Sequence, residues 1–252
     1  PKTQFESENI GKPMQGHTKD MFEKITEVDT SSLKDQTILD LGAGTGRFVD
    51  LVKDNNIVIS IDYSAAIDVL QDNFGGQSEK LLAVQGDALM LPFKENVFDF
   101  SYSIGVLHHT PDPGLGIKNI YRCLKENGEF AIALYGEGSY YDFPTITMWR
   151  NIFNFTWKIF GAIPPLLYTY IFVSIIWPIG KISRYASFPF RLFFPIANLP
   201  DIRWSYLDTF DSITPSYQST HNAYQVQNFF IDAGFIEGKS TNWGSTSYKA
   251  KK

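Results

Sequence analysis

Cysteine is almost absent from this chain of 252 residues, in which Cys123 is the single one. One cysteine excludes an internal disulfide and is typical of a reducing compartment, so we expect a cytoplasmic location. Cys123 falls inside a helical pattern at residues 120–124, which favours a packing role over that of a nucleophile. We also expect no secretory leader, because the first residues lack the pattern of one.

Positive charge is scarce as well. Lys and Arg number 22 against 27 Asp and Glu, a formal net charge of −5. Nucleic-acid-binding proteins normally carry a basic face, so this balance argues against a nucleic-acid partner. No Cys/His cluster has the spacing of a zinc site, and no Ser/His/Asp or Cys/His arrangement indicates a covalent nucleophile. We therefore expect no metal site.

What the chain does contain is a strand-to-helix turn rich in glycine, within ILDLGAGTGRF at residues 38–48. An apolar run leads into Gly42, Gly44 and Gly46, and a helical pattern follows. Glycine reaches φ > 0 at such a turn and lets a ligand approach where a Cβ would clash. A turn of this kind is a weak signal alone, so the segments that follow decide its meaning.

Two acidic residues come at the ends of further apolar runs. Asp62 lies about 20 residues after Gly42, where a carboxylate can accept hydrogen bonds from both hydroxyls of a ribose. Asp87 can accept from the exocyclic amine of an adenine. Arg47 occupies the third glycine position of a dinucleotide fingerprint, which disfavours the alternative of an NAD-linked oxidoreductase.

These segments resemble the class I S-adenosylmethionine (SAM)-dependent methyltransferases, in particular the methyltransferase type 11 group. LDLGAGTGRF is similar to the family's first motif, IVISIDYS to its second and VQGDALMLPF to its third. FDFSYSIGVLHHTPDP and RCLKENGEFAIALYG resemble the segments around its fourth and fifth strands. The resemblance covers residues 30–136 closely and residues 221–240 more weakly.

The resemblance implies SAM as cofactor, with S-adenosylhomocysteine as product. Asp62 would hold the ribose, and Tyr63 would cover one face of the adenine. Asp40 either contacts the amino group, directly or through a water, or is a structural acid of the turn. The full set of implied cofactor residues is Asp40, Gly42, Gly44, Gly46, Asp62, Tyr63, Asp87, Ala88, Ser103 and Ile104. Among these, the glycines would pack under the methionine part, Asp87 and Ala88 would read the adenine edge, and the backbone at Ser103 and Ile104 would meet the amino-acid end.

The alternation of strand and helix patterns predicts an α/β fold with a parallel sheet and helices on both faces. Together with the resemblance, it implies a Rossmann-like, doubly wound, mostly parallel seven-stranded sheet with an aromatic-rich helical insertion after the fifth strand. We expect a cap helix and SAM-binding core over 1–136, an apolar insertion over 137–220, and a last helix with an antiparallel hairpin over 221–252. The expected helices include 46–54 and 114–126, the latter stopped by Asn127-Gly128. Residues 201–220 are expected to form a loop.

The insertion is chemically distinct from the rest of the chain. Residues 137–200 hold 17 of the 39 aromatic residues, and residues 159–180 carry no charge. That length could span a bilayer, but Pro164, Pro165 and Pro178 are expected to break it and leave about a dozen helical residues. A lid over the active site is the leading interpretation. A transmembrane span, or an interface with another subunit or with a membrane through 159–191, remains the alternative.

Histidines are the candidate bases for the acceptor. His108 and His109 follow the fourth strand, and adjacent side chains there are expected to diverge, so that at most one faces the methyl group. His109 is the first candidate, and His17 and His221 are the others. Ser103-Ile104-Gly105-Val106 departs from the Asn/Asp-Pro-Pro-Tyr of exocyclic-amine methyltransferases.

The sequence thus predicts in-line methyl transfer to a small, apolar or amphipathic molecule. An inactive methyltransferase-like binding protein and a lipid- or quinone-type methyltransferase at a membrane surface are the alternatives. The acceptor and the oligomeric state stay open.

Overall fold

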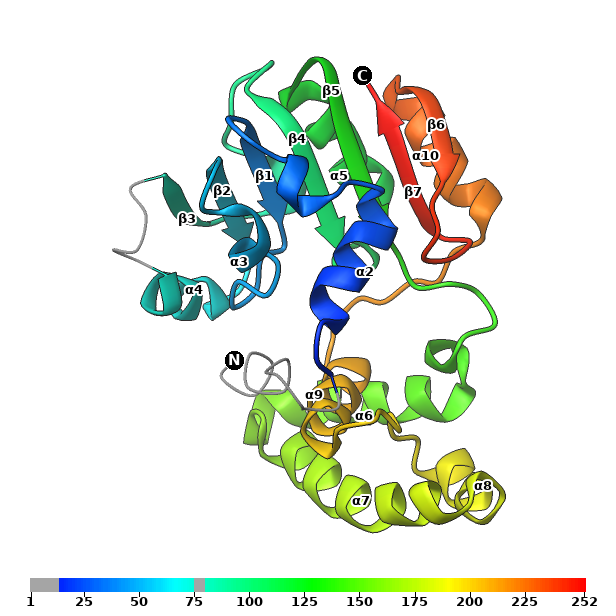
Figure 1. The fold of residues 1–252 in the computed structure, drawn as a ribbon. Coiled ribbons are helices and arrows are strands. Elements are labelled where there is room, and N and C mark those ends of the chain that lie inside the picture. The colour runs from blue at the N-terminus through cyan, green and yellow to red at the C-terminus, as the bar shows by residue number, and fades with distance from the viewer. Residues whose placement is uncertain (1–13, 75–79) are drawn as a thin grey trace. The chain divides into compact units, whose positions relative to one another are not determined.

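The computed structural model describes residues 14–74 and 80–252 (Figure 1). Contacts within the chain divide it into two units. The sheet unit comprises Gly16–Glu137 and Ser219–Lys252, and the helical unit comprises Gly138–Gln218 together with residues 14–15. Each unit is described by itself below.

The described residues form a seven-stranded sheet in the order β3-β2-β1-β4-β5-β7-β6 (Figure 1). The first five strands are parallel to one another, and β7 runs antiparallel to both β5 and β6. The strands are β1 (Thr37–Leu41), β2 (Ile57–Asp62), β3 (Leu81–Gln85), β4 (Phe98–Ile104), β5 (Leu124–Ala133), β6 (Ile236–Ser240) and β7 (Ser247–Lys251). This confirms the predicted doubly wound sheet.

Helices cover both faces of the sheet because the strands are apolar on both sides. In β1, Ile38 packs into a cluster with Phe22 of α2, whereas Leu39 packs into another with Ile117 of α5. Burying one such side chain contributes roughly 1.5–3 kcal/mol. The helices of this unit are α2 (His17–Thr26), α3 (Val49–Val52), α4 (Ala66–Phe74), α5 (Pro113–Cys123) and α10 (Ala223–Ala233). Short 3₁₀ turns η1 (Thr30–Ser32), η2 (Ala88–Met90) and η3 (Leu107–His109) connect them.

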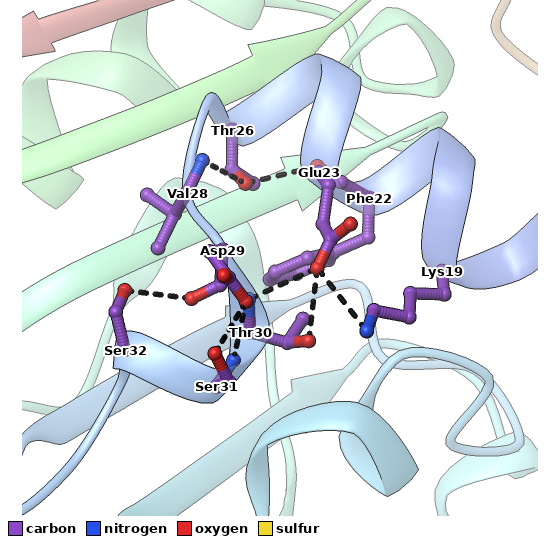
Figure 2. Close-up of polar contacts among 9 residues, drawn as sticks. All are labelled: Lys19, Phe22, Glu23, Thr26, Val28, Asp29, Thr30, Ser31 and Ser32. Carbon is purple, nitrogen blue, oxygen red and sulfur yellow. Dashed lines mark hydrogen bonds and ion pairs between the residues drawn. The ribbon is translucent and has the colours of Figure 1, made fainter.

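A polar network fixes the passage from α2 to β1 (Figure 2). Glu23 Oε1 accepts hydrogen bonds from Thr30 N at 3.1 Å and Thr30 Oγ1 at 3.0 Å. Asp29 caps η1, because its Oδ1 accepts from Ser31 N at 2.8 Å. Phe22 of α2 meets Tyr102 of β4 edge to face, with ring centroids 5.0 Å apart. Helix α2 is thus anchored to the sheet by its apolar face, and the chain that leaves it is held by side chains.

The described residues of the helical unit form four helices and the short turn η4 (Tyr140–Asp142). They are α6 (Pro144–Phe160), α7 (Ile163–Ile182), α8 (Arg184–Phe193) and α9 (Ile202–Ile213). Its core is aromatic: Phe172 stacks on Phe194 with ring centroids 4.1 Å apart, and Phe153 packs with Tyr168 and Ile213. The predicted aromatic-rich segment after the fifth strand is therefore helical.

Two sequence predictions about this unit are wrong. The prolines do not break the apolar run, because Pro164 and Pro165 lie in the first turn of α7, where a missing N–H costs nothing. Pro178 lies inside the helix near its end and is also tolerated there. Residues 201–220 are not all loop, since Asp201 caps α9 by accepting from Arg203 N at 2.8 Å.

Two helices in the sheet unit are also shorter than the sequence predicted. The helix expected over 46–54 is only α3, because the glycine turn extends further along the chain. The helix expected over 114–126 ends at Cys123, and Asn127-Gly128 lies inside β5 rather than at a helix stop. A Cβ on Gly128 would lie 2.9 Å from Lys125 O, so a glycine is needed there for close backbone approach.

Candidate active site

The glycine turn lies at the carboxyl end of β1, the edge at which parallel sheets bind ligands. Gly42 N donates to Ile61 O at 2.8 Å, which ties the turn to β2. Gly42, Gly44 and Gly46 have φ of 82°, 53° and 93°. A Cβ on Gly42 would lie 2.2 Å from Val106 Cγ2, whereas a Cβ on Gly44 would meet nothing within 4 Å. Gly42 is therefore required by packing, and Gly44 leaves open space over the turn.

Asp62 lies at the end of β2 and holds this turn directly. Its Oδ2 accepts from Gly44 N at 2.8 Å, and its Oδ1 accepts from Ser64 N at 2.8 Å and Ser64 Oγ at 2.7 Å. The side chain is half-buried. Each carboxylate oxygen has two lone pairs, so acceptor capacity remains for the hydroxyls of a ribose.

The residues predicted to meet an adenine follow β2 and β3. Tyr63 is 77% exposed, so its ring is available to cover a ligand. Asp87 caps η2, its Oδ1 accepting from Leu89 N at 2.8 Å, and Ala88 begins that turn. In the sheet, Asp62 pairs with Gln85, two residues before Asp87. The two acids thus end adjacent strands at one edge.

The residues at the end of β4 lie beside the glycine turn, because β4 pairs with β1. Ser103 is fully buried, and its hydroxyl has no hydrogen-bond partner among the described residues. Ile104 is half-buried, and Gly105 follows with φ of 76°. A Cβ on Gly105 would meet nothing within 4 Å, as at Gly44. Two glycines with left-handed backbone and open space therefore lie on neighbouring strand ends.

Asp40 is a buried acid on β1, paired in the sheet with Tyr102 of β4. Burial raises the pKa of Asp40 to about 8; the nearby Tyr102 hydroxyl opposes this rise and the charge of Asp62 adds to it. Neither Asp40 Oδ2 nor the Tyr102 hydroxyl has a hydrogen-bond partner of good geometry in the part of the chain that the structure describes. A buried carboxyl oxygen without a partner is costly, so Asp40 Oδ2 points to a ligand or a water.

Three of the histidines gather beyond β4 and β5. His108 and His109 do not diverge as predicted: their Nε2 atoms lie 3.1 Å apart. The 3₁₀ turn η3 brings them together, since it curls the backbone back on itself after β4. His108 O accepts from Ser219 N at 2.9 Å, and Ser219 Oγ lies 2.9 Å from His221 Nε2. His17 lies elsewhere, at the start of α2, with its ring 6.2 Å from that of Trp243.

Two histidines of this cluster, His108 and His221, have pKa values below that of a free imidazole. Burial lowers the pKa of His108 well below its usual value, and the neighbouring His109 and His221 lower it further. Burial also lowers the pKa of His221, against opposing contributions from Gln225 and Glu137. His108 is therefore neutral at pH 7. In the contact between the two Nε2 atoms, one ring presents N–H and the other a lone pair.

Sequence reasoning missed Tyr135 and Ser219. The Tyr135 ring stacks on that of His108 with centroids 3.6 Å apart, and Ser219 joins the loop before α10 to η3. A signal for Tyr135 existed, because it follows the fifth strand at the carboxyl edge of the sheet. Ser219 had none, since only the fold brings the loop before α10 beside η3.

A cavity of about 530 Å³ lies at the opposite edge of the sheet. It is lined by residues that precede β1 and by the beginnings of β4 and β5, among them Asp29, Gln36, Asp99 and Lys125. Lys125 Nζ donates to both oxygens of Asp99 at 2.9 Å. Because the carboxyl ends of the strands carry the glycine turn, this cavity is not the candidate cofactor site. Among the described residues, no group of three or more His, Cys, Asp and Glu side chains is arranged to hold a metal.

Comparison with known proteins agrees with this geometry. A family model described as "Methyltransferase domain" matches residues 39–132. The 2-methyl-6-phytyl-1,4-hydroquinone methyltransferase of Arabidopsis thaliana is 34% identical over 58% of this chain and 42% of its own length. The demethylmenaquinone methyltransferase of Paenarthrobacter aurescens is 28% identical over 60% of each chain. The sterol 24-C-methyltransferase of Pneumocystis carinii is 35% identical over 38% of this chain and 27% of its own. The chain therefore matches less than two thirds of the length of each of these relatives.

Solved structures share the fold. A SAM-dependent methyltransferase from Aquifex aeolicus superposes with a TM-score of 0.51 at 11% identity, over 98% of this chain and 96% of that one. A Haemonchus contortus phosphoethanolamine N-methyltransferase 2, in complex with S-adenosylhomocysteine, gives 0.52 at 16% identity over 89% of this chain and 38% of that one. Residues 39–132 thus match a methyltransferase domain, and the solved structures share its fold.

SAM is the cofactor that the methyltransferase domain and the similar solved structures imply, and the residues present fit it. Gly44 and Gly105 leave room where a Cβ would fill the cradle. Asp62 retains acceptor capacity for a ribose, and the exposed Tyr63 ring is available for an adenine. The unpartnered Asp40 Oδ2 suits the cationic amino group of the methionine part.

Proposed function

We propose that this chain transfers the methyl group of SAM to a small acceptor that is apolar or amphipathic. The observation that carries the acceptor class is the helical unit, which follows β5 directly and is the most aromatic part of the chain. The names of three relatives support it, since they refer to a phytyl hydroquinone, a demethylmenaquinone and a sterol. Each of those is an apolar or amphipathic molecule.

The cofactor residues act by binding and alignment. When bound, SAM supplies an electrophilic methyl group on a sulfonium, so the protein needs no nucleophile. Asp62 would accept hydrogen bonds from the ribose hydroxyls, and Asp87 with Ala88 would contact the adenine edge. Asp40 would accept a hydrogen bond from the amino group at the other end. Holding the cofactor at both ends would align its methyl group for transfer, and such alignment is a large part of the rate.

His109 is the proposed base. Of the imidazole pair, His108 is fully buried and neutral, whereas His109 is half-buried and can be reached from outside. The contact between their Nε2 atoms and the stacked Tyr135 ring hold the pair in one orientation. His109 takes the proton that the acceptor loses as it gains the methyl group, and S-adenosylhomocysteine leaves in equal amount.

The proposal is tested with purified protein and SAM labelled in its methyl group. One acceptor is a polyprenyl hydroquinone, and the matched control is the same ring without the prenyl chain. We expect label in the polyprenyl product and little in the control, with one S-adenosylhomocysteine per methyl transferred. A cell lipid extract, analysed by mass spectrometry, widens the search to other lipids. Tight SAM binding without transfer to any lipid-extract component would favour the inactive binding protein instead.

A further inference from the structure

The helices of the helical unit bury one apolar face and expose another. In α6, Ile146 and Phe153 are buried, yet Met148, Ile152, Phe155 and Ile159 form an exposed row at helical spacing. Phe155 is 73% exposed. A surface helix of a self-contained domain normally has one apolar face, and its opposite face is polar. The exposed row on α6 therefore has no role in the unit's own core.

The same pattern continues in α7. Ile163, Leu167, Ile171 and Ile175 recur every fourth residue, and each is exposed. The opposite side of the helix, which includes Val173, packs into the core of the unit. Because both faces are apolar, this helix has little amphipathic character although it lies at the surface. An apolar row of this length is unfavourable in water and marks a contact surface.

A third row lies on α8, the short helix that packs against α7. Tyr185, Phe188 and Leu192 recur at helical spacing and are exposed, Tyr185 at 92%. Three consecutive helices thus present exposed apolar rows. We call these three exposed rows together the apolar surface of α6–α8.

The distribution of charged residues around this surface indicates what kind of partner it binds. No Asp or Glu occurs between Asp142 and Asp201, although the whole chain is net negative at −5. Lys158, Lys181 and Arg191 lie in the last turns of α6, α7 and α8. A helix dipole favours a cation in that place, but it does not explain the absence of every acid. Apolar rows flanked only by cations match a membrane surface with anionic headgroups.

Aromatic residues beside the cations fit the same partner. Lys181 Nζ lies 5.0 Å from the centre of the Trp177 ring, and Lys158 follows the exposed Trp157. Trp and Tyr are enriched where one end of the side chain is apolar and the other is wet, as at the headgroup level of a bilayer. We propose that the apolar surface of α6–α8 docks on an anionic phospholipid bilayer.

The surface lies on the membrane rather than across it. α7 is long and apolar enough to span a bilayer, but a third of its apolar window is buried within the protein. Side chains of α7 also form hydrogen bonds with residues 195–206 of the same unit. Tyr168 donates to Pro195 O at 3.1 Å, Trp177 to Leu199 O at 2.9 Å, and Ser174 Oγ lies 2.8 Å from Tyr206 Oη. A helix held in this way is part of a folded surface.

Docking does not require the acceptor to be known, but its use in reaching a lipid-borne acceptor rests on the proposed function. The test is flotation of the full chain with vesicles of phosphatidylcholine alone or with phosphatidylglycerol added. We expect the protein to float with the anionic vesicles and to remain below with the neutral ones. High salt should reduce the floating fraction, since anionic headgroups then attract the cations less.

Two pairs of variants make the test specific. Phe155→Asp/Tyr185→Asp should reduce binding to anionic vesicles at least tenfold, and Leu82→Asp/Tyr224→Asp, at exposed positions of the sheet unit, should not. Lys158→Gln/Lys181→Gln/Arg191→Gln should reduce it about tenfold or more. Its control is Lys34→Gln/Lys94→Gln/Lys118→Gln, which removes the same charge from the sheet unit.

SAM binding by each protein is measured in parallel, so that a failure of docking is distinguished from a failure of the proposed function. A folded, SAM-binding protein that ignores both kinds of vesicle would overturn the docking proposal. So would equal losses in a variant and its control, or a dimer in solution that hides the surface. Resistance to extraction by alkaline carbonate would overturn it in favour of a transmembrane α7.

Discussion

The two units differ in how they bury their apolar residues. In the sheet unit the strands are apolar on both faces, and helices cover each face, so Ile38 and Leu39 are both fully buried. In the helical unit, Phe155 and Ile175 are exposed although neighbours such as Phe153 and Ile176 are buried. The sheet unit carries the candidate cofactor site at one edge. The helical unit has an apolar surface that its own fold does not use.

The first prediction separates the catalytic role of His109 from SAM binding and from membrane docking. His109→Ala should lower turnover by about 10²-fold or more, because a positioned base contributes that much to proton transfer. SAM affinity and vesicle binding should stay nearly unchanged. Steady-state kinetics with labelled SAM, beside calorimetry, measures both. An equal loss of turnover and SAM affinity would mean that His109 supports the fold of the site and is no base.

The second prediction concerns the acid that holds the glycine turn. Asp62→Ala should weaken SAM binding by roughly 1.5–3 kcal/mol, the range for losing hydrogen bonds to a charged acceptor. Calorimetric titration with SAM measures this. The matched control is Asp68→Ala, which removes an exposed carboxylate from α4. If Asp62→Ala bound SAM as well as the parent protein, the ribose acid would have to be another residue.

The third prediction compares two glycines in the same turn. Gly42→Ala should lower the free energy of unfolding by about 1–3 kcal/mol more than Gly44→Ala, because the added methyl group would overlap Val106. Gly44→Ala fills open space, so its main effect should be weaker SAM binding. Denaturant unfolding and calorimetry on the two variants check this. A reversed order of stabilities would contradict the packing described for the turn.

The fourth prediction is a dependence of stability on pH. Burial raises the pKa of Asp40 from 3.8 to about 8, so the folded protein binds more protons than the unfolded chain between those values. The contribution of Asp40 to stability is thus present below pH 3.8 and is lost as the pH rises toward about 8, with a slope of up to about 1.4 kcal/mol per pH unit.

Asp40→Asn should remove this part of the slope. Urea unfolding of parent and variant at several pH values measures the difference. Parallel pH profiles would show that Asp40 is ionised in the folded protein. Saturating SAM should reduce the slope of the parent, since the amino group would stabilise the ionised carboxylate.

Much of the sheet unit could be predicted from the sequence, because its signals are local. Apolar runs ending at Asp62 and Asp87 define strands, and the glycines that follow Leu41 define the turn. The contact of His108 with His109 could not be predicted, because it depends on a 3₁₀ turn without a strong sequence signal. The neighbourhood of Ser219 also depends on contacts that are distant in sequence.

The helical unit was harder to predict for a different reason. Its composition indicated helices with an apolar surface, but the effect of a proline depends on its position in a helix. Pro164 and Pro165 begin α7 rather than break it, and this depends on where the helix starts. In α9, buried residues such as Trp204 and Thr209 stabilise a helix where the local sequence resembles a loop. Tertiary packing thus decided the case of α9, and the position of the helix start decided that of the prolines.

The most direct test of the account is a calorimetric titration of the full chain with SAM, S-adenosylhomocysteine and NAD. The glycine turn, Asp62 and the unpartnered Oδ2 of Asp40 together predict one site that binds both SAM and S-adenosylhomocysteine and has a clear preference for them over NAD. Saturable binding at a ratio of one per chain, with NAD giving little or no heat, is the expected result. Binding of NAD with equal or higher affinity, or no binding of SAM by the folded protein, would contradict it.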